Sequence, residues 1–164
     1  MPTVPHAEAT RAFCAASSLL AALLAVAPTP AKAGDPADTR SLSAAWSSQG
    51  SNVVVEEGTA EPRSIGSYAV RVYHGRPNGG DALFFKTGIV RARDGTLAKL
   101  AFVDLDGDRL DELAVIMQSV GSGSYLAADA FRLRNGVLSW VASVDGLQST
   151  ADVEAELRKA AAAR

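Results

Sequence analysis

The feature that most constrains the fold is a series of short β-like runs separated by tight-turn signals. Asn135-Gly136 separates two of these runs, and this dipeptide is the strongest short hairpin signal in the chain because both residues tolerate positive φ. Strands joined by tight turns must pair antiparallel. The runs predicted as strands are residues 52–56, 67–73, 83–93, 97–103, 113–117, 126–134 and 137–144.

The pattern within the runs predicts how each strand is buried. Residues 67–73 alternate between apolar and polar side chains, which is typical of a half-buried strand, whereas residues 113–117 are continuously apolar, as in a central strand. Asp94-Gly95 is interpreted as a further hairpin turn. Residues 151–162 form the one helical pattern, with Ser149 or Thr150 as its N-cap. We therefore predict an all-β protein, an antiparallel β-sandwich or half-open barrel of about seven to eight strands with a short C-terminal helix.

The N-terminal 33 residues are predicted to be a cleavable secretory signal peptide. A polar start is followed by an apolar run over residues 12–27, and Ala31-x-Ala33 has the small-residue form of a cleavage site. The run is shorter than the roughly 20 residues that a membrane-spanning helix needs. Residues 34–51 are interpreted as a flexible leader, and residues 52–164 as one β domain.

Composition excludes several classes of function. Removal of the signal leaves 14 Lys and Arg against 17 Asp and Glu, with no basic cluster beyond Arg158-Lys159, which argues against nucleic-acid binding. Cys14 lies in the signal, so the mature chain has no cysteine. The mature chain also has no second run long enough to span a membrane. We expect a soluble protein in the periplasm or outside the cell.

Catalytic chemistry has little support. The mature chain contains one histidine, His74, beside a Gly/Pro turn, and the order of residues 121–125 differs from the Gly-x-Ser-x-Gly of a nucleophile elbow. With no cysteine and one histidine, zinc catalysis is disfavoured. Acidic residues are numerous enough to leave a carboxylate-pair glycosidase open, although no cleft can be recognised in the sequence. We expect that the protein is not an enzyme.

Residues 104–112 form an acidic loop with two open interpretations. Asp104, Asp106, Asp108 and Glu112 occupy positions 1, 3, 5 and 9, from which carboxylates can converge on calcium. The loop is not an EF-hand, because Arg109 stands where that motif has glycine. It is either an acidic turn whose Asp side chains bond their own backbone, or the ligand set of a calcium-dependent secreted β binding module.

The segment Gly121-Ser122-Gly123-Ser124-Tyr125 also has two interpretations. It is either a hairpin or bulge loop whose glycines satisfy the backbone of a turn, or a recognition loop. In a recognition loop the glycines allow close approach, the serines supply small hydrogen-bonding groups, and the tyrosine supplies rigid area with a polar tip.

Three segments together favour the recognition loop over the simple turn. They are EPRSIGSYAVRVY (61–73), RARDGTL (91–97) and AFVDLDGDRLDELAVIMQSVGSGSYLAADAFRL (101–133). From about Val53 to Val144 the chain resembles the periplasmic inhibitors of I-type (invertebrate-type) lysozyme. The Ser-Gly-x-Tyr motif of that family is matched by Ser122-Gly123-Ser124-Tyr125, directly after the acidic turn and the apolar strand.

The resemblance implies a periplasmic, all-β bacterial protein that has no catalysis or cofactor of its own and that can form a homodimer. It implies that the loop enters the active-site cleft of I-type lysozyme and so protects bacterial peptidoglycan. The partner-binding residues would be Gly121, Ser122, Gly123, Ser124 and Tyr125. Arg63, Ser64 and Tyr68 would form either a neighbouring contact or part of the scaffold.

Overall fold

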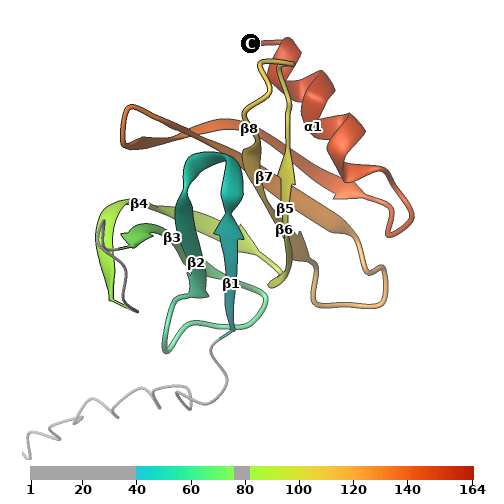
Figure 1. Ribbon diagram of the computed structural model, residues 1–164. Coiled ribbons are helices and arrows are strands. Elements are labelled where there is room, and N and C mark those ends of the chain that lie inside the picture. Colours follow the sequence, from blue (N-terminus) through green and yellow to red (C-terminus); the bar gives the residue numbers. More distant parts are fainter. Residues whose placement is uncertain (1–39, 76–81) are drawn as a thin grey trace, which may run out of the picture. The chain divides into compact units, whose positions relative to one another are not determined.

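The computed structural model describes residues 40–75 and 82–164, which form eight strands and a C-terminal helix. The strands make two four-stranded antiparallel sheets with no closed barrel, so the predicted sandwich is confirmed (Figure 1). Sheet A has the order β1 (Ser41–Trp46), β2 (Ser51–Glu57), β3 (Ile65–Gly75) and β4 (Leu83–Asp94). Sheet B has the order β5 (Thr96–Val103), β6 (Glu112–Gln118), β7 (Leu126–Arg134) and β8 (Val137–Leu147).

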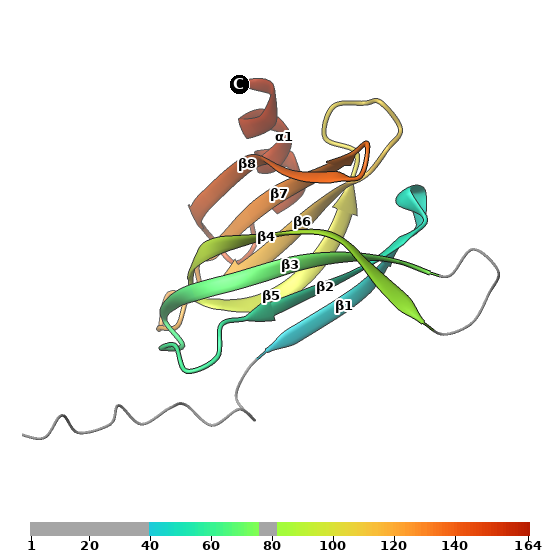
Figure 2. The same ribbon diagram turned by 90° about the vertical axis from the view of Figure 1, so that its left-hand side faces the viewer.

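Sheet B is covered on both faces, which explains the continuously apolar run. Along β6 the side chains alternate between the two faces. Leu113, Val115 and Met117 join the core between the sheets, whereas Ala114 and Ile116 join a second cluster under α1 (Val153–Ala162). The result is three layers, sheet A, sheet B and the helix (Figure 2).

The core between the sheets is built from inward-facing residues of both. In β2 and β3 every second side chain is buried, as alternation predicts. Tyr68 packs edge-on against Phe131, with ring centroids 6.3 Å apart. The buried members of this cluster are Trp46, Val53, Val55, Tyr68, Val70, Val72, Leu97, Leu113, Val115, Met117, Phe131, Leu133 and Leu138.

The predicted flexible leader is wrong for the part that the structure describes. Residues 41–51 form β1, a short 3₁₀ helix (Ser47–Gln49) and the start of β2, and β1 is an edge strand paired along its length with β2. Trp46 is fully buried, packs against Phe102 and donates its indole N–H to the Asp111 carbonyl at 3.0 Å. One large aromatic anchor therefore orders a segment whose composition is otherwise typical of a loop. Residues 34–39 and the predicted signal peptide lie outside the described residues.

The two hairpin predictions have opposite outcomes. Asn135 and Gly136 have φ of +51° and +79° and connect β7 to β8, as the two-residue turn requires. Asp94-Gly95 does not form a hairpin, because β4 ends sheet A and β5 begins sheet B. Gly95 has φ of +91°, and its N–H donates to the Ser64 carbonyl at 2.7 Å instead of to a partner strand.

The C-terminal helix is shorter than predicted and is capped by a different residue. Asp152, and not Ser149 or Thr150, is the N-cap, and its side chain accepts a hydrogen bond from the Ala155 N–H at 3.0 Å. Val153 and Leu157 are buried against sheet B. Within residues 40–75 and 82–164, no helix is long and apolar enough to cross a membrane.

Candidate functional site

The recognition loop, defined here as residues 119–125, connects the central strands β6 and β7 of sheet B. Its ends are fixed by register, since Gln118 on β6 pairs with Leu126 on β7. Ser122 and Tyr125 are exposed, with 45% of Tyr125 accessible. Neither hydroxyl bonds to any of the described residues, so both are available to a partner. The loop thus presents polar side chains on a rigid base of paired strands.

A backbone hydrogen bond and an unusual dihedral set the shape of the loop. The Ser119 N–H donates to the Tyr125 carbonyl at 2.9 Å and closes the neck. Ser124 has φ of +46°, in the left-handed region that a residue with a Cβ adopts only at a cost. This backbone reversal places the Tyr125 ring over Gly123, where a Cβ would come within 2.3 Å of the ring carbon Cε2. Gly123 therefore makes room for the tyrosine.

A pocket of about 310 Å³ lies beside the tyrosine. Tyr125, Ser119 and Leu126 contribute one side of it, and the exposed carboxylates Asp94 and Asp145 contribute acidic character. The structure therefore brings the end of β4 and the end of β8 next to the predicted loop. Neither Asp94 nor Asp145 was among the predicted site residues, because nothing local in the sequence connects them to the loop.

Tyr68 belongs to the scaffold, and the backbone of Arg63 and Ser64 takes part in it. Tyr68 is fully buried, and its hydroxyl donates to the Asp129 carboxylate at 2.5 Å. Burial, reinforced by the negative charge of Asp129, raises the pKa of Tyr68 far above its ordinary value. Arg63 and Ser64 offer backbone carbonyls to Arg93 and Gly95. None of these contacts puts a side chain at the recognition loop.

The acidic loop lies at the opposite end of β6 from the recognition loop, in the yellow segment beside α1 in Figure 1. Asp104, Asp106 and Asp108 each have a carboxylate oxygen within 4.8 Å of the others. These carboxylates accept hydrogen bonds from backbone N–H groups. Asp104 accepts the N–H of Gly107 at 2.7 Å and that of Arg109 at 2.9 Å. Burial acts to raise the pKa of Asp104, but these backbone hydrogen bonds lower it below its ordinary value.

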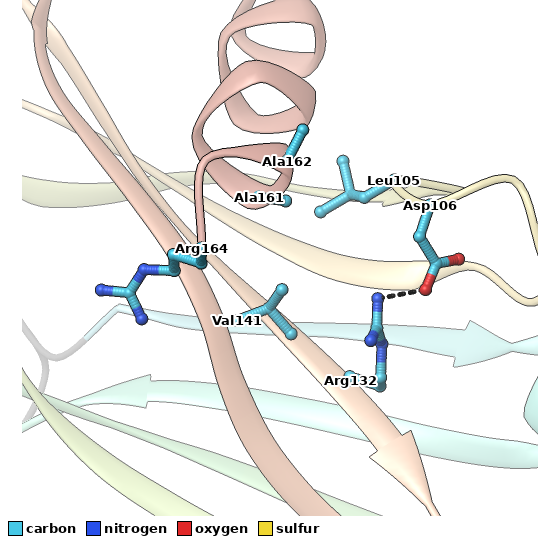
Figure 3. A pocket seen from close by; sticks show the side chains of 7 residues that line it. All are labelled: Leu105, Asp106, Arg132, Val141, Ala161, Ala162 and Arg164. Carbon is cyan, nitrogen blue, oxygen red and sulfur yellow. Dashed lines mark ion pairs between the residues drawn. The ribbon is translucent and has the colours of Figure 1, made fainter.

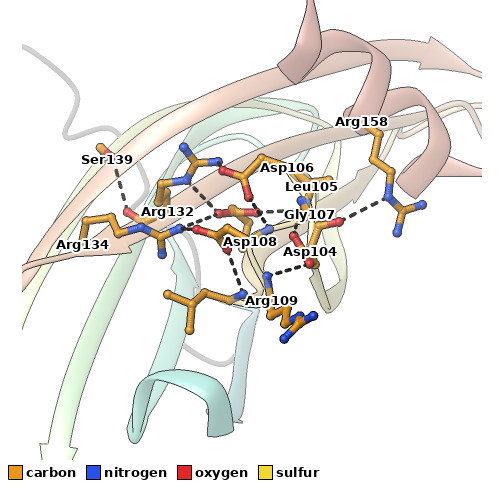
Figure 4. Close-up of polar contacts among 12 residues, drawn as sticks. Asp104, Leu105, Asp106, Gly107, Asp108, Arg109, Arg132, Arg134, Ser139 and Arg158 are labelled. Carbon is orange, nitrogen blue, oxygen red and sulfur yellow. Dashed lines mark hydrogen bonds and ion pairs between the residues drawn. The ribbon is translucent and has the colours of Figure 1, made fainter.

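Arginines occupy the side of the acidic loop that faces β7 (Figure 4). Arg132 contacts Asp106 at 2.5 Å and donates to Glu112 at 2.8 Å, and Arg134 pairs with Asp108. Glu112 is buried, lies outside the aspartate group and also accepts the Leu105 N–H. The carboxylates of Asp106, Asp108 and Glu112 are therefore already paired with guanidinium groups, which favours the interpretation as an acidic turn.

A second pocket, of about 470 Å³, lies between the end of α1 and sheet B on the acidic-loop side (Figure 3). Val141, Leu105 and Ala161 give it an apolar floor, and the Arg132–Asp106 ion pair lies across one side. Its one carboxylate, that of Asp106, is held in the ion pair with Arg132. His74 lies elsewhere, exposed beside Phe84 at the end of β3.

Comparison with known proteins decides the family. The sequence model of the family described as PliI, periplasmic lysozyme inhibitor of I-type lysozyme, matches residues 41–161. This chain belongs to the PliI family. The match spans both sheets and most of α1, so it also covers the recognition loop. The family is one of inhibitor proteins that act on I-type lysozyme in the periplasm and not of enzymes, as the resemblance predicted.

Two solved structures of PliI from Aeromonas hydrophila are similar to this member of the PliI family. The structure of PliI-Ah, a periplasmic inhibitor of I-type lysozyme, is 40% identical, with a TM-score of 0.62 over 72% of this chain and 98% of that chain. The structure of PliI in complex with Meretrix lusoria lysozyme is 42% identical, with a TM-score of 0.64 over 73% of this chain and 95% of that chain. A comparison with curated protein sequences gives no match.

Proposed function

We propose that this PliI family member inhibits I-type lysozyme by inserting the recognition loop into the active-site cleft of the enzyme. The observation that carries the proposal is the loop between the central strands β6 and β7, in which Ser122 and Tyr125 are exposed and their hydroxyls have no partner among the described residues. A relative that is 42% identical forms a complex with the lysozyme of Meretrix lusoria.

The chemistry of the loop suits the catalytic centre of a glycosidase. Such an enzyme uses a pair of carboxyl groups on either side of the scissile bond. The hydroxyls of Ser122 and Tyr125 can donate hydrogen bonds to those carboxylates, and bonds to an ionised acceptor are stronger than neutral ones. Tyr125 adds rigid contact area with few rotatable bonds, which is typical of an interface hot spot. Occupation of the cleft would exclude peptidoglycan.

Inhibition of Meretrix lusoria lysozyme acting on bacterial cell walls tests the proposal. Wild-type protein should inhibit this enzyme, and chicken-type and goose-type lysozymes should be inhibited far less. Tyr125→Ala should weaken inhibition by about 2 kcal/mol or more, as truncation of a hot spot does. Ser122→Ala should weaken it less, since one hydroxyl is lost. Ser48→Ala, an exposed serine of the 3₁₀ helix, is the matched control and should inhibit like wild type.

Two further parts of the proposal concern the mature protein. Residues 1–33 act as a signal peptide that is cleaved after Ala33, so the periplasmic protein begins at Gly34. Mass spectrometry of protein recovered from the periplasm tests this, and a retained N-terminus would contradict it. The mature chain also forms a homodimer, as the resemblance implies. Sedimentation velocity at micromolar concentration tests that state, and a monomer would contradict it.

A further inference from the structure

The neck of the recognition loop lies directly against the crossover from sheet A to sheet B. A Cβ built on Gly95 would stand 2.2 Å from the Gln118 carbonyl oxygen and 2.9 Å from the Ser119 Cα. Both partners are backbone atoms, which cannot swing aside as a side-chain end can. Gln118 is the last residue of β6, and Ser119 is the residue whose N–H closes the loop. The position of Gly95 therefore fixes where the loop begins.

A single buried guanidinium fixes Gly95 in turn. Arg93 is 3% exposed, and one of its terminal nitrogens donates to the Gly95 carbonyl. The same side chain donates to the carbonyls of Arg63 at 2.7 Å, Pro62 at 3.2 Å and Ser67 at 3.3 Å. It therefore ties the crossover to the connection between β2 and β3. A planar group with five donors is suited to hold several carbonyls at once.

The charge of Arg93 is balanced by a second buried residue. Glu57, at the end of β2, is 7% exposed and lies 3.9 Å from the guanidinium. Its other carboxylate oxygen accepts the Leu97 N–H at 2.7 Å, at the start of β5. Removing two charges from water costs free energy that their attraction only partly repays, so such a pair is weak evidence for stability. Its effect here is to fix one arrangement of the strand ends around Gly95.

We propose that Arg93 and Gly95 are positioning residues that hold the recognition loop in its binding geometry, a role that rests on the function proposed above. A loop held in its bound shape loses less conformational entropy when it binds, so its affinity is higher. Movement of the Gln118 and Ser119 backbone would be passed to the Tyr125 carbonyl through the hydrogen bond at the neck. Neither residue needs to touch the lysozyme.

The test compares Gly95→Ala with Gly107→Ala. Both glycines have strongly positive φ, +91° and +80°, so both substitutions introduce similar backbone strain. Gly107 has nothing within 4 Å of the added carbon and lies at the opposite end of β6. We expect Gly95→Ala to raise the inhibition constant for Meretrix lusoria lysozyme about tenfold through lost preorganisation, and Gly107→Ala to leave it unchanged. Equal inhibition constants for the two variants would overturn the positioning role.

A double-mutant cycle with Tyr125→Ala separates positioning from general damage. If Gly95 acts through the loop, Gly95→Ala should change inhibition little once Tyr125 has been truncated, because the two effects are coupled. Additive effects would overturn the role. A wild-type protein that fails to inhibit I-type lysozyme would overturn the proposed function as well, so the two failures are distinguishable.

Arg93→Lys covers the case in which Gly95→Ala does not fold. Lysine keeps the positive charge opposite Glu57 but cannot hold the four carbonyls. Arg71→Lys is the matched control, because Arg71 pairs with Glu56 on the outer face of sheet A. We expect a several-fold rise in the inhibition constant for Arg93→Lys alone, at temperatures where both variants are folded. Unchanged inhibition by a folded Arg93→Lys variant would overturn the role of Arg93.

Discussion

Gly123→Ala should weaken inhibition without weakening the fold. The added Cβ would lie 2.3 Å from Tyr125 Cε2 and 2.6 Å from Cδ2, whereas carbon atoms in favourable contact are about 3.5 to 4.0 Å apart. The ring must therefore withdraw by more than about 1 Å. Because Tyr125 is 45% exposed, the ring can move into solvent at little cost to folding. The free energy of unfolding should change by less than about 0.5 kcal/mol, as for other surface substitutions.

The expected loss of affinity follows from the position of the ring. If Tyr125 fills a complementary site as a hot spot, displacing it should forfeit about 1.4 to 2.7 kcal/mol, a roughly 10- to 100-fold rise in the inhibition constant. Gly121→Ala is the matched control in the same loop, since nothing lies within 4 Å of its added carbon. Inhibition of Meretrix lusoria lysozyme and thermal melting would be measured for both variants. A Gly123→Ala variant that inhibits as well as Gly121→Ala would refute the reasoning.

Three other outcomes are expected. Trp46→Ala should lower the free energy of unfolding by about 3 to 5 kcal/mol in urea denaturation, because it empties a fully buried site. A change within about 0.5 kcal/mol, the size typical of surface substitutions, would contradict the role of Trp46 in anchoring β1. Tyr68→Phe should make stability less sensitive to alkaline pH. The pKa of Tyr68 is raised in the folded state, so its contribution to the free energy of unfolding is complete below about pH 10, the unfolded pKa, and is lost as the pH rises further. If urea denaturation showed that variant and wild type lose equal stability between about pH 8 and pH 11, this reasoning would be contradicted. Millimolar calcium should leave the melting temperature unchanged, since Arg132 and Arg134 already pair with Asp106 and Asp108. A rise in the melting temperature that a chelator reverses would restore the calcium interpretation.

The strands were predictable because each is encoded by its own residues. The Asn135-Gly136 turn and the apolar run at 113–117 depend on backbone preference and on the two faces of one strand, which are local properties. That residues 119–125 form a loop between two strands was predictable for the same reason, because these residues are contiguous. β1 was not, since its order depends on Trp46 reaching a carbonyl 65 residues away.

The contacts around the loop could not be predicted because they join residues that are distant in sequence. Asp94-Gly95 has the composition of a hairpin turn, yet it connects sheet A to sheet B. The neighbouring Arg93 donates hydrogen bonds to carbonyls about 30 residues earlier in the chain, a contact that no local pattern reveals. Glu112 has the spacing of a calcium ligand, yet its burial and its bond to Arg132 depend on the pairing of strands. Sequence patterns reveal which groups are available, and tertiary packing decides which of them meet.

The hydrogen bond between the Ser119 N–H and the Tyr125 carbonyl makes the recognition loop a closed ring on top of two fixed strands. Residues inside that ring can change without altering the pairing of β6 with β7, because no ladder bond passes through them. Under the proposed function, a change of target enzyme would therefore require replacing six residues, 120–125. Under the same proposal, β6 and β7 would serve as a constant frame, and grafting another segment between Ser119 and Leu126 would give inhibitors of other hydrolases that have a cleft.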